Sequence, residues 1–255
     1  IESARAGEAG RGFAVVADEV HSVGDVVGTI ARDFEAELAR RIGDLERLVV
    51  TMAGQAQGER LVDLALNAIE LIDRNLYERT CDVRWWATDP AIAECAAAPT
   101  PERAAYAAQR LGVILGAYTV YLDLWVCGGD GRILANGRPD RYAVAGESVA
   151  AATWFRDARA LTGADAYVAA DIAVEPLLGD AQVATFAARI GEGEGVLAVH
   201  FDWAPQAGAI VGGIRVGAAA RDRTRVLLVD GRGRVIAASD GEATLRETVA
   251  LQTVG

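Results

Sequence analysis

The sequence predicts an α+β protein in which a long coiled-coil helix precedes an antiparallel sheet domain. Two observations predict this fold class. Apolar residues recur with a period near 3.5 over residues 13–56, whereas after Tyr118 they alternate with a period of two in several short runs. The first period is that of a coiled-coil helix and the second is that of half-buried strands, so the two parts of the chain differ in architecture.

The composition limits the class of protein. Of the 255 residues, 52% are apolar and 24% are charged, which favours a packed core over disorder. The net charge of −11 repels nucleic acid, so we expect no nucleic-acid partner. Cys81, Cys95 and Cys127 have no regular spacing and no CxxC or HxxxH pair is present, so the sequence predicts neither a disulfide framework nor a metal site, and no cofactor.

The coiled-coil pattern covers residues 13–56. Its apolar positions are separated by steps of three and four, with two successive four-residue steps at Leu38 and Ile42 that locally unwind a supercoil. A single helix cannot bury such a stripe, so we expect a homodimer through the coiled coil. Two glycines in the segment 53–58 predict a hinge before a second helix over 59–86. The stripe consists of Val16, Val20, Val23, Val27, Ile30, Phe34, Leu38, Ile42, Leu45, Val49, Met52 and Ala56.

Prolines and glycines mark the shorter elements that follow. Asp89-Pro90 and Pro101-Glu102 each place a proline where a helix begins, and the second of these helices runs to about Leu115. A glycine-rich turn at 128–131 joins two strands of a hairpin, and two short helices are expected within 147–160. Five strands with helices between the second and the third form a PAS-like, α+β order. The expected strands are 118–127, 132–136, 166–174, 182–190 and 195–203.

A weak internal repeat links residues 124–135 with residues 227–238. Both segments read as a strand, a glycine turn, a Gly-Arg pair and an apolar strand. The repeat predicts that residues 219–255 start a second PAS-like module. Two unrelated β-hairpins would give the same pattern, so the sequence leaves both interpretations open.

Residues 1–20 are the most distinctive segment. The run Glu2-Ser-Ala-Arg-Ala-Gly-Glu-Ala-Gly-Arg-Gly-Phe-Ala-Val-Val-Ala-Asp-Glu-Val closely resembles the hairpin tip of methyl-accepting chemotaxis proteins. Its glycines, each of which weakens a helix by about 1 kcal/mol, suit a tight reversal between two antiparallel helices. The resemblance implies contacts with neighbouring receptor dimers, the coupling protein CheW and the kinase CheA. The matching residues are Glu2, Arg5, Glu8, Phe13 and Val15, and for the apolar ones the alternative is a place in the helix-bundle core.

The order of elements over residues 60–240 resembles a Cache-type sensor, the extended PAS-like domain of chemoreceptors. The motif Trp154-Phe-x-x-Ala is similar to the Trp-Tyr-x-x-Ala helix of amino-acid-binding Cache domains. Tyr167 and Asp171 occupy the comparable stretch after it, and His200 stands where a strand aspartate is expected. The resemblance implies a domain that binds a small molecule, an amine or an amino acid.

Strand alternation predicts a ligand pocket independently of this resemblance. Side chains an even number of residues apart share a face of a strand, which groups Tyr121 with Asp123 and Trp125. Aromatic walls with carboxylates suit a cationic or amine-bearing ligand. Core packing is the alternative for Trp154, and a hydrogen-bonded place within the strand is the alternative for His200. The predicted ligand-binding residues are Tyr121, Asp123, Trp125, Trp154, Tyr167, Asp171, His200 and Asp202.

These patterns predict a chemoreceptor-type signal transducer rather than an enzyme. Residues 1–58 would form the signalling tip and coiled-coil helix, residues 59–218 the Cache-like sensor with its long leading helix, and residues 219–255 the start of the second module. No uncharged apolar run of 18 residues is present, so we expect a cytoplasmic sensor. The resemblance to chemoreceptors implies an association with membrane receptor arrays. The alternative is a coiled-coil scaffold of receptor clusters whose sensor no longer binds a ligand.

Overall fold

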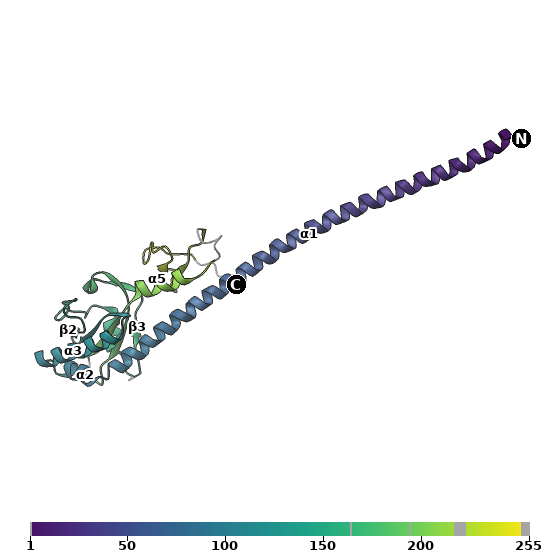
Figure 1. Cartoon of the computed structure of the whole chain (residues 1–255). Helices are drawn as coiled ribbons and strands as arrows, with labels where there is room; N and C mark the ends of the chain where they lie inside the picture. Colours follow the sequence, from purple (N-terminus) through teal and green to yellow (C-terminus); the bar gives the residue numbers. More distant parts are fainter. Residues whose placement is uncertain (1, 164, 194, 217–222, 251–255) are drawn as a thin grey trace. The chain divides into compact units, whose positions relative to one another are not determined.

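The computed structural model describes residues 2–163, 165–193, 195–216 and 223–250, without the side chains of residues 2–6 and 8–10. The chain divides into two compact units, Ile1–Val62 and Asp63–Gly255. The fold is α+β, as predicted (Figure 1). Its helices and strands are α1 (Glu2–Trp86), α2 (Pro90–Ala97), α3 (Pro101–Ala117), β1 (Tyr121–Cys127), β2 (Ile133–Asn136), α4 (Thr153–Arg159), β3 (Val168–Ala169), β4 (Ala173–Glu175), η1 (Pro176–Leu178), β5 (Ala181–Arg189), β6 (Val196–Asp202), α5 (Trp203–Gly213), β7 (Leu227–Val229) and β8 (Val235–Ala238).

Helix α1 runs without a break from Glu2 to Trp86. The hinge predicted at 53–58 was wrong, because a glycine weakens a helix by about 1 kcal/mol without removing its backbone hydrogen bonds. The helix also passes through Gly7, Gly10 and Gly12 without the predicted reversal. In the described part of the chain, no helix has an apolar stretch long enough to span a membrane.

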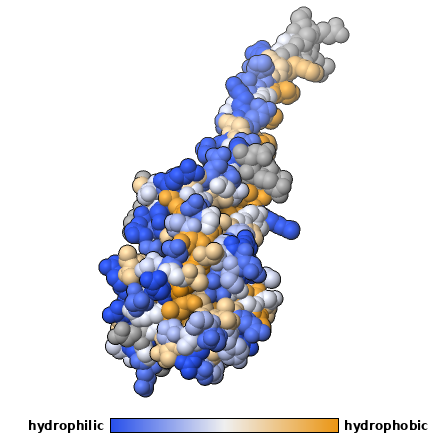
Figure 2. All heavy atoms as spheres, turned by 90° about the vertical axis from the view of Figure 1, so that its left-hand side faces the viewer, coloured by the Kyte–Doolittle hydropathy of each residue, from blue (hydrophilic) through white to orange (hydrophobic). Residues whose placement is uncertain are grey.

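The apolar stripe of α1 is exposed in the first unit. Phe13 is 81% exposed and Phe34 is 66% exposed, and Val20, Val27 and Ile30 are also open to solvent. Figure 2 shows apolar side chains at the surface of this helix among hydrophilic ones. Such a stripe in water is unfavourable, since each large apolar side chain gains about 1.5–3 kcal/mol on burial. The stripe therefore has the properties of a surface that packs against another helix.

The main sheet lies in the second unit and is antiparallel throughout. Its strand order is β2-β1-β6-β5-β3. Strand β4 also pairs with β5, at residues 181–183, whereas β3 pairs with residues 186–187. The strand predicted at 166–174 is thus two short strands. Ala169 pairs with Phe186 and Ala173 pairs with Val183, so three residues on one side face two on the other. The extra residue is a bulge, which frees residues 171–172 from the ladder.

Two apolar clusters cover the two faces of this sheet. On one face, the end of α1 and helices α2 and α3 bury Trp86, Ile92 and Leu111 against the strands. On the other face, α4 buries Phe155 and Ala158. Helices α2 and α3 begin at Pro90 and Pro101, as predicted, and the side chains of Asp89 and Thr100 cap them. Only one helix, α4, forms within residues 147–160, where two were predicted.

A bulge in β1 corrects the predicted grouping of its side chains. The pairing of β1 with β6 shifts register between Tyr121 and Asp123. Tyr121 consequently packs in the cluster on the α1–α3 face, whereas Trp125 packs in the cluster on the α4 face. Tyr121 and Trp125 were predicted to share a face, and this was wrong because the bulge breaks the two-residue alternation on which the prediction depended.

The hairpins β1–β2 and β7–β8 share one hydrogen-bond pattern. In each turn a glycine with positive φ, Gly131 at 82° and Gly233 at 76°, precedes an arginine. The N–H of each glycine donates to the carbonyl oxygen three residues earlier, at 2.9 Å in both hairpins. Val149 and Val249 then donate to the carbonyl oxygens of Gly131 and Gly233, both at 2.8 Å. The shared pattern supports the sequence repeat, while a second module over 219–255 stays a prediction.

Candidate ligand-binding site

A cavity of about 520 Å³ lies between α4, the interrupted strands β3 and β4, and strand β5. Helix α4 forms one wall, and the free segment between β3 and β4 contributes to another. We call it the acid-lined cavity, because three of its lining residues are acidic. The lining residues are Thr153, Trp154, Asp157, Val168, Ala169, Ala170, Asp171, Ala173, Val174, Glu175, Val183 and Thr185.

The charged residues that line this cavity all have the same sign. Asp157, Asp171 and Glu175 contribute carboxylates, and no cationic residue is among the described lining residues. Glu175 is half-buried, and its Oε1 accepts the N–H of Leu177 at 3.1 Å. Burial raises the pKa of Glu175, and the hydrogen bond from Leu177 partly opposes this rise. A bound cation would interact favourably with the carboxylates that line this cavity.

Helix geometry explains the wall formed by α4. Residues three apart lie on the same side of a helix, so Trp154 and Asp157 both face the cavity. Phe155 and Ala158 face the core, and Trp154, which is only 9% exposed, packs in the same apolar cluster as well as lining the cavity. The part of the Trp154 indole that remains exposed lines the same cavity as the carboxylate of Asp157, a combination that suits an ammonium group.

A second layer of polar residues lies behind the cavity. The hydroxyl oxygen of Thr185, which lines the cavity, is 3.1 Å from Nδ1 of His200. His200 is fully buried, and within the described part of the chain its Nε2 has no hydrogen-bond partner. Its ring lies 3.9 Å from the ring of Trp125 and 6.0 Å from that of Trp154, centroid to centroid. Burial lowers the pKa of His200 to about 3, so the imidazole is neutral near pH 7.

Asp123 has a structural environment. Its two oxygens accept N–H groups from Leu124, Trp125, Asn136, Gly137 and Arg138 at 2.7–3.1 Å. Burial raises the pKa of this carboxyl, and the hydrogen bonds partly offset the rise. Asp123 joins β1 to the end of β2 and does not line the acid-lined cavity.

The other predicted residues are dispersed. The hydroxyl group of Tyr121 bonds to Asp82 on the α1–α3 side of the sheet. Tyr167 is 39% exposed beside the guanidinium group of Arg84, which lies 5.5 Å from its ring centroid. Asp202 is half-buried at the start of α5, and burial raises its pKa. The structure thus brings Trp154 and Asp171 into the cavity, His200 and Trp125 behind it, and Tyr121, Asp123, Tyr167 and Asp202 outside its lining.

The predicted signalling-tip residues lie on α1. The side chains of Glu2, Arg5 and Glu8 lie outside the described residues. Phe13 and Val15 are described, and both are exposed. Their contact with another protein stays a prediction.

Of the twelve lining residues, the sequence prediction included only Trp154 and Asp171, and three of the polar ones that it missed are Asp157, Thr185 and Glu175. Asp157 could have been found, because it lies three residues after Trp154 and therefore on the same side of the helix. Thr185 lies two residues after Val183 on β5, so strand alternation places both side chains on the same face, towards the cavity. Glu175 gave no signal beyond its place before Pro176.

A second cavity of about 590 Å³ lies on the other side of α4 and is lined partly by Arg156, Arg159 and Arg189. The guanidinium group of Arg189 donates to the carbonyl oxygens of Leu161, Glu192 and Gly193. That of Arg159 donates to the carbonyl oxygen of Gly129 at 3.0 Å. Because Arg159 and Arg189 already bind backbone oxygens, they primarily hold loops in place.

Comparison with known proteins addresses the architecture. No protein-family model and no curated protein matches the sequence. Among solved structures, the sensor domain of the histidine kinase DctB of V. cholerae is similar at a TM-score of 0.60 and 15% identity, over 75% of this chain and 70% of that chain. The fold is that of a Cache-like sensor domain.

Two chemoreceptor domains share this sensor fold. The sensory domain of the Campylobacter jejuni chemoreceptor Tlp3 is similar at a TM-score of 0.56 and 13% identity, over 80% of this chain and 78% of that chain. The ligand-binding domain of the Pseudomonas aeruginosa amino acid chemoreceptor PctC, solved in complex with GABA, has a TM-score of 0.52 at 17% identity, over 73% of this chain and 76% of that chain. At these identities the likeness concerns the sensor fold, and the ligand must be argued from this chain's own residues.

Proposed function

We propose that this chain is a small-molecule sensor whose acid-lined cavity binds an amine. One observation carries the proposal: the cavity holds three carboxylates and the indole of Trp154, with no cation among its described lining residues. An ammonium group would gain charge-assisted hydrogen bonds and a cation–π contact there. Among the described lining residues, the side-chain donors open to a ligand carboxylate are uncharged: the hydroxyl groups of Thr153 and Thr185 and the indole N–H of Trp154.

Three probes of equal chain length test this proposal. 1,4-Diaminobutane carries two ammonium groups, 4-aminobutanoate carries one ammonium group and one carboxylate, and butanedioate carries two carboxylates. Isothermal titration calorimetry near pH 7.5 should rank their affinities in that order. Equal binding of all three, or tighter binding of butanedioate, would contradict an amine site.

A matched pair of variants assigns the binding to the cavity. Asp157→Asn should weaken 1,4-diaminobutane binding about tenfold, since a partly exposed charged hydrogen bond contributes about 1–1.5 kcal/mol. Asp140→Asn removes the same charge at an exposed position outside the cavity lining and should leave the affinity unchanged. If both variants weaken binding equally, the effect comes from net charge and not from the cavity.

The signalling part of the proposal rests on residues 1–20. We assign to them the chemotaxis role implied by their resemblance to methyl-accepting chemotaxis proteins: α1 forms a homodimer and contacts CheA and CheW, in the cytoplasm and at receptor arrays, without catalytic activity of its own. The exposed Phe13 and Val15 support such contacts. Co-sedimentation with purified CheA and CheW should occur with the wild type and be lost in Phe13→Asp.

The scaffold alternative predicts a different pair of results. A scaffold would co-sediment with CheA and CheW but would bind none of the three probes. A protein that binds 1,4-diaminobutane and fails to co-sediment would be a sensor with another output.

A further inference from the structure

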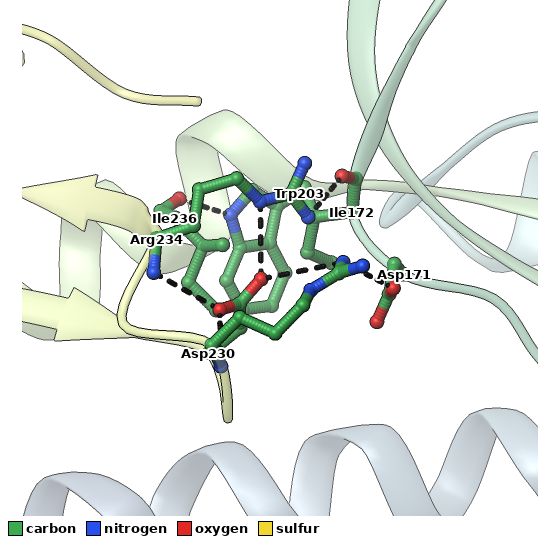
Figure 3. Close-up of polar contacts among 7 residues, drawn as sticks. Asp171, Ile172, Trp203, Asp230, Arg234 and Ile236 are labelled. Carbon is green, nitrogen blue, oxygen red and sulfur yellow. Dashed lines mark hydrogen bonds and ion pairs between the residues drawn. The ribbon is translucent and has the colours of Figure 1, made fainter. Parts of the chain in front are cut away.

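The turn of the β7–β8 hairpin contacts residues 171–172, the segment between β3 and β4. A guanidinium nitrogen of Arg232 lies 2.6 Å from Oδ2 of Asp171. A guanidinium nitrogen of Arg234 donates to the carbonyl oxygen of Ile172 at 3.0 Å (Figure 3). Two arginines of one turn therefore hold the two adjacent residues of this segment.

Asp230 fixes the conformation of this turn. Its Oδ1 accepts the backbone N–H groups of Arg232 and Arg234, at 2.9 and 3.0 Å. Its Oδ2 also accepts the side-chain Nε–H of Arg234 at 3.0 Å. The indole N–H of Trp203 donates to the carbonyl oxygen of Ile236 at 2.6 Å and ties β8 to α5 (Figure 3). The arginines are thus presented from a preorganised turn.

Asp171 belongs to both structures, because it lines the acid-lined cavity and pairs with Arg232. A guanidinium group and a ligand ammonium group are like charges that would meet at one carboxylate. Each weakens the binding of the other by repulsion and by competition for the same oxygens.

We propose that Arg232 is an internal competitor of the ligand, so that binding in the acid-lined cavity loosens the β7–β8 hairpin from residues 171–172. This inference rests on the proposed function, since it requires a cationic ligand. It adds a determinant of affinity outside the cavity and a route by which occupancy reaches a second element of the fold. Linkage makes the effect reciprocal: the hairpin contact weakens ligand binding by the same free energy by which the bound ligand weakens the hairpin contact.

The size of the effect follows from exposure. Both side chains of the pair are 68% exposed, so water and salt screen it. We therefore expect Arg232→Gln to bind 1,4-diaminobutane about two- to fivefold more tightly than the wild type, with a smaller gain at high salt. A merely structural role for Arg232 would give weaker binding, not tighter.

Arg246→Gln is the control, since it removes the same charge from an exposed position of the same region. It should bind 1,4-diaminobutane as the wild type does. In an Asp171→Asn background, the substitution Arg232→Gln should no longer change the affinity, because its partner carboxylate is gone.

Hydrogen exchange provides the second measurement. Amide exchange over residues 227–238 should become faster in the wild type when 1,4-diaminobutane is added, and should be fast in Arg232→Gln with or without it. Unchanged or lower affinity of Arg232→Gln, with the diamine still bound by the wild type, overturns the competitor and leaves the proposed function standing. If the wild type binds no diamine, the proposed function fails and the competitor with it.

Discussion

The hydroxyl oxygen of Thr185 and Nδ1 of His200 lie 3.1 Å apart, which connects the wall of the acid-lined cavity to a buried imidazole. The environment of this histidine makes stability dependent on pH. Its pKa is lowered from 6.5 to about 3 by burial, so the unfolded chain takes up the proton at a higher pH than the folded one. The resulting contribution to stability is complete above about pH 6.5 and is lost as the pH falls towards 3.

We therefore expect acidification from pH 7 to pH 5 to destabilise the wild type relative to His200→Gln. Between the pKa of 6.5 in the unfolded chain and that of about 3 in the folded protein, the free energy of unfolding falls by about 1.4 kcal/mol per pH unit. Urea unfolding of both proteins at several pH values measures the difference. The raised carboxyl pKa values of Asp123, Glu175 and Asp202 act in the opposite direction, and they cancel in the comparison because both proteins contain them. Parallel pH profiles of the two proteins would contradict this role of His200.

A second prediction concerns Asp123. In Asp123→Asn, an NH₂ group would face N–H donors that now point at a carboxylate oxygen. Such a buried mismatch should cost about 2–4 kcal/mol of the free energy of unfolding. Asp130→Asn is the control, because Asp130 accepts the N–H of Arg132 in an exposed turn and an asparagine can replace it. A loss in Asp123→Asn no larger than in the control would show that the hydrogen bonds are not maintained in solution.

The turn glycine of the first hairpin gives a third prediction. A Cβ at Gly131 would lie 2.6 Å from Cα of Ala150, in a backbone with φ of 82°. Gly131→Ala should therefore destabilise the fold by more than about 2 kcal/mol, from strain and overlap together. Gly146 has a φ of 93°, and a Cβ there would meet no described atom within 4 Å, so Gly146→Ala should show the conformational strain alone, about 1 kcal/mol. Equal losses would mean that the main chain at Ala150 moves away freely.

The exposed stripe of α1 gives a fourth prediction. Ile30→Lys places a charge within the stripe and should shift the protein from dimer to monomer in light scattering after gel filtration. Glu46→Lys introduces the same side chain at an exposed position outside the stripe and should leave the dimer intact. A monomeric wild type at micromolar concentration would exclude dimerisation through α1.

Periodicity in the sequence was sufficient for the architecture of the sensor. The expected strands 182–190 and 195–203 differ from β5 and β6 by about one residue at each end. The strand at 166–174 was misjudged, because nothing in its composition signals the extra residue that separates β3 from β4. The hinge predicted at 53–58 was wrong for a different reason: the low helix propensity of Gly54 and Gly58 was given more weight than the helix-forming residues around them.

The candidate site was only partly predictable. Trp154 and Asp171 were found from the family-like motif and reach one cavity. Tyr121 was misplaced because a single bulge moved it to the other side of the sheet. Arg232 was not predictable at all, since its contact with Asp171 joins residues far apart in the chain and depends on tertiary packing.

The segment 171–172 contributes Asp171 to the cavity but takes no part in the strand pairing of the sheet. Strand β5 is paired with β6 from Val183 to Arg189 along its other edge, and β3 and β4 hold the segment only at its two ends. Ile172 is buried in the apolar cluster on the α1–α3 face, whereas the side chain of Asp171 is 68% exposed, so Asp171 can be exchanged without moving a strand register or opening the core. A new ligand preference can therefore arise through the exchange of one exposed side chain at the cavity wall while the folding of the sheet remains almost unaffected.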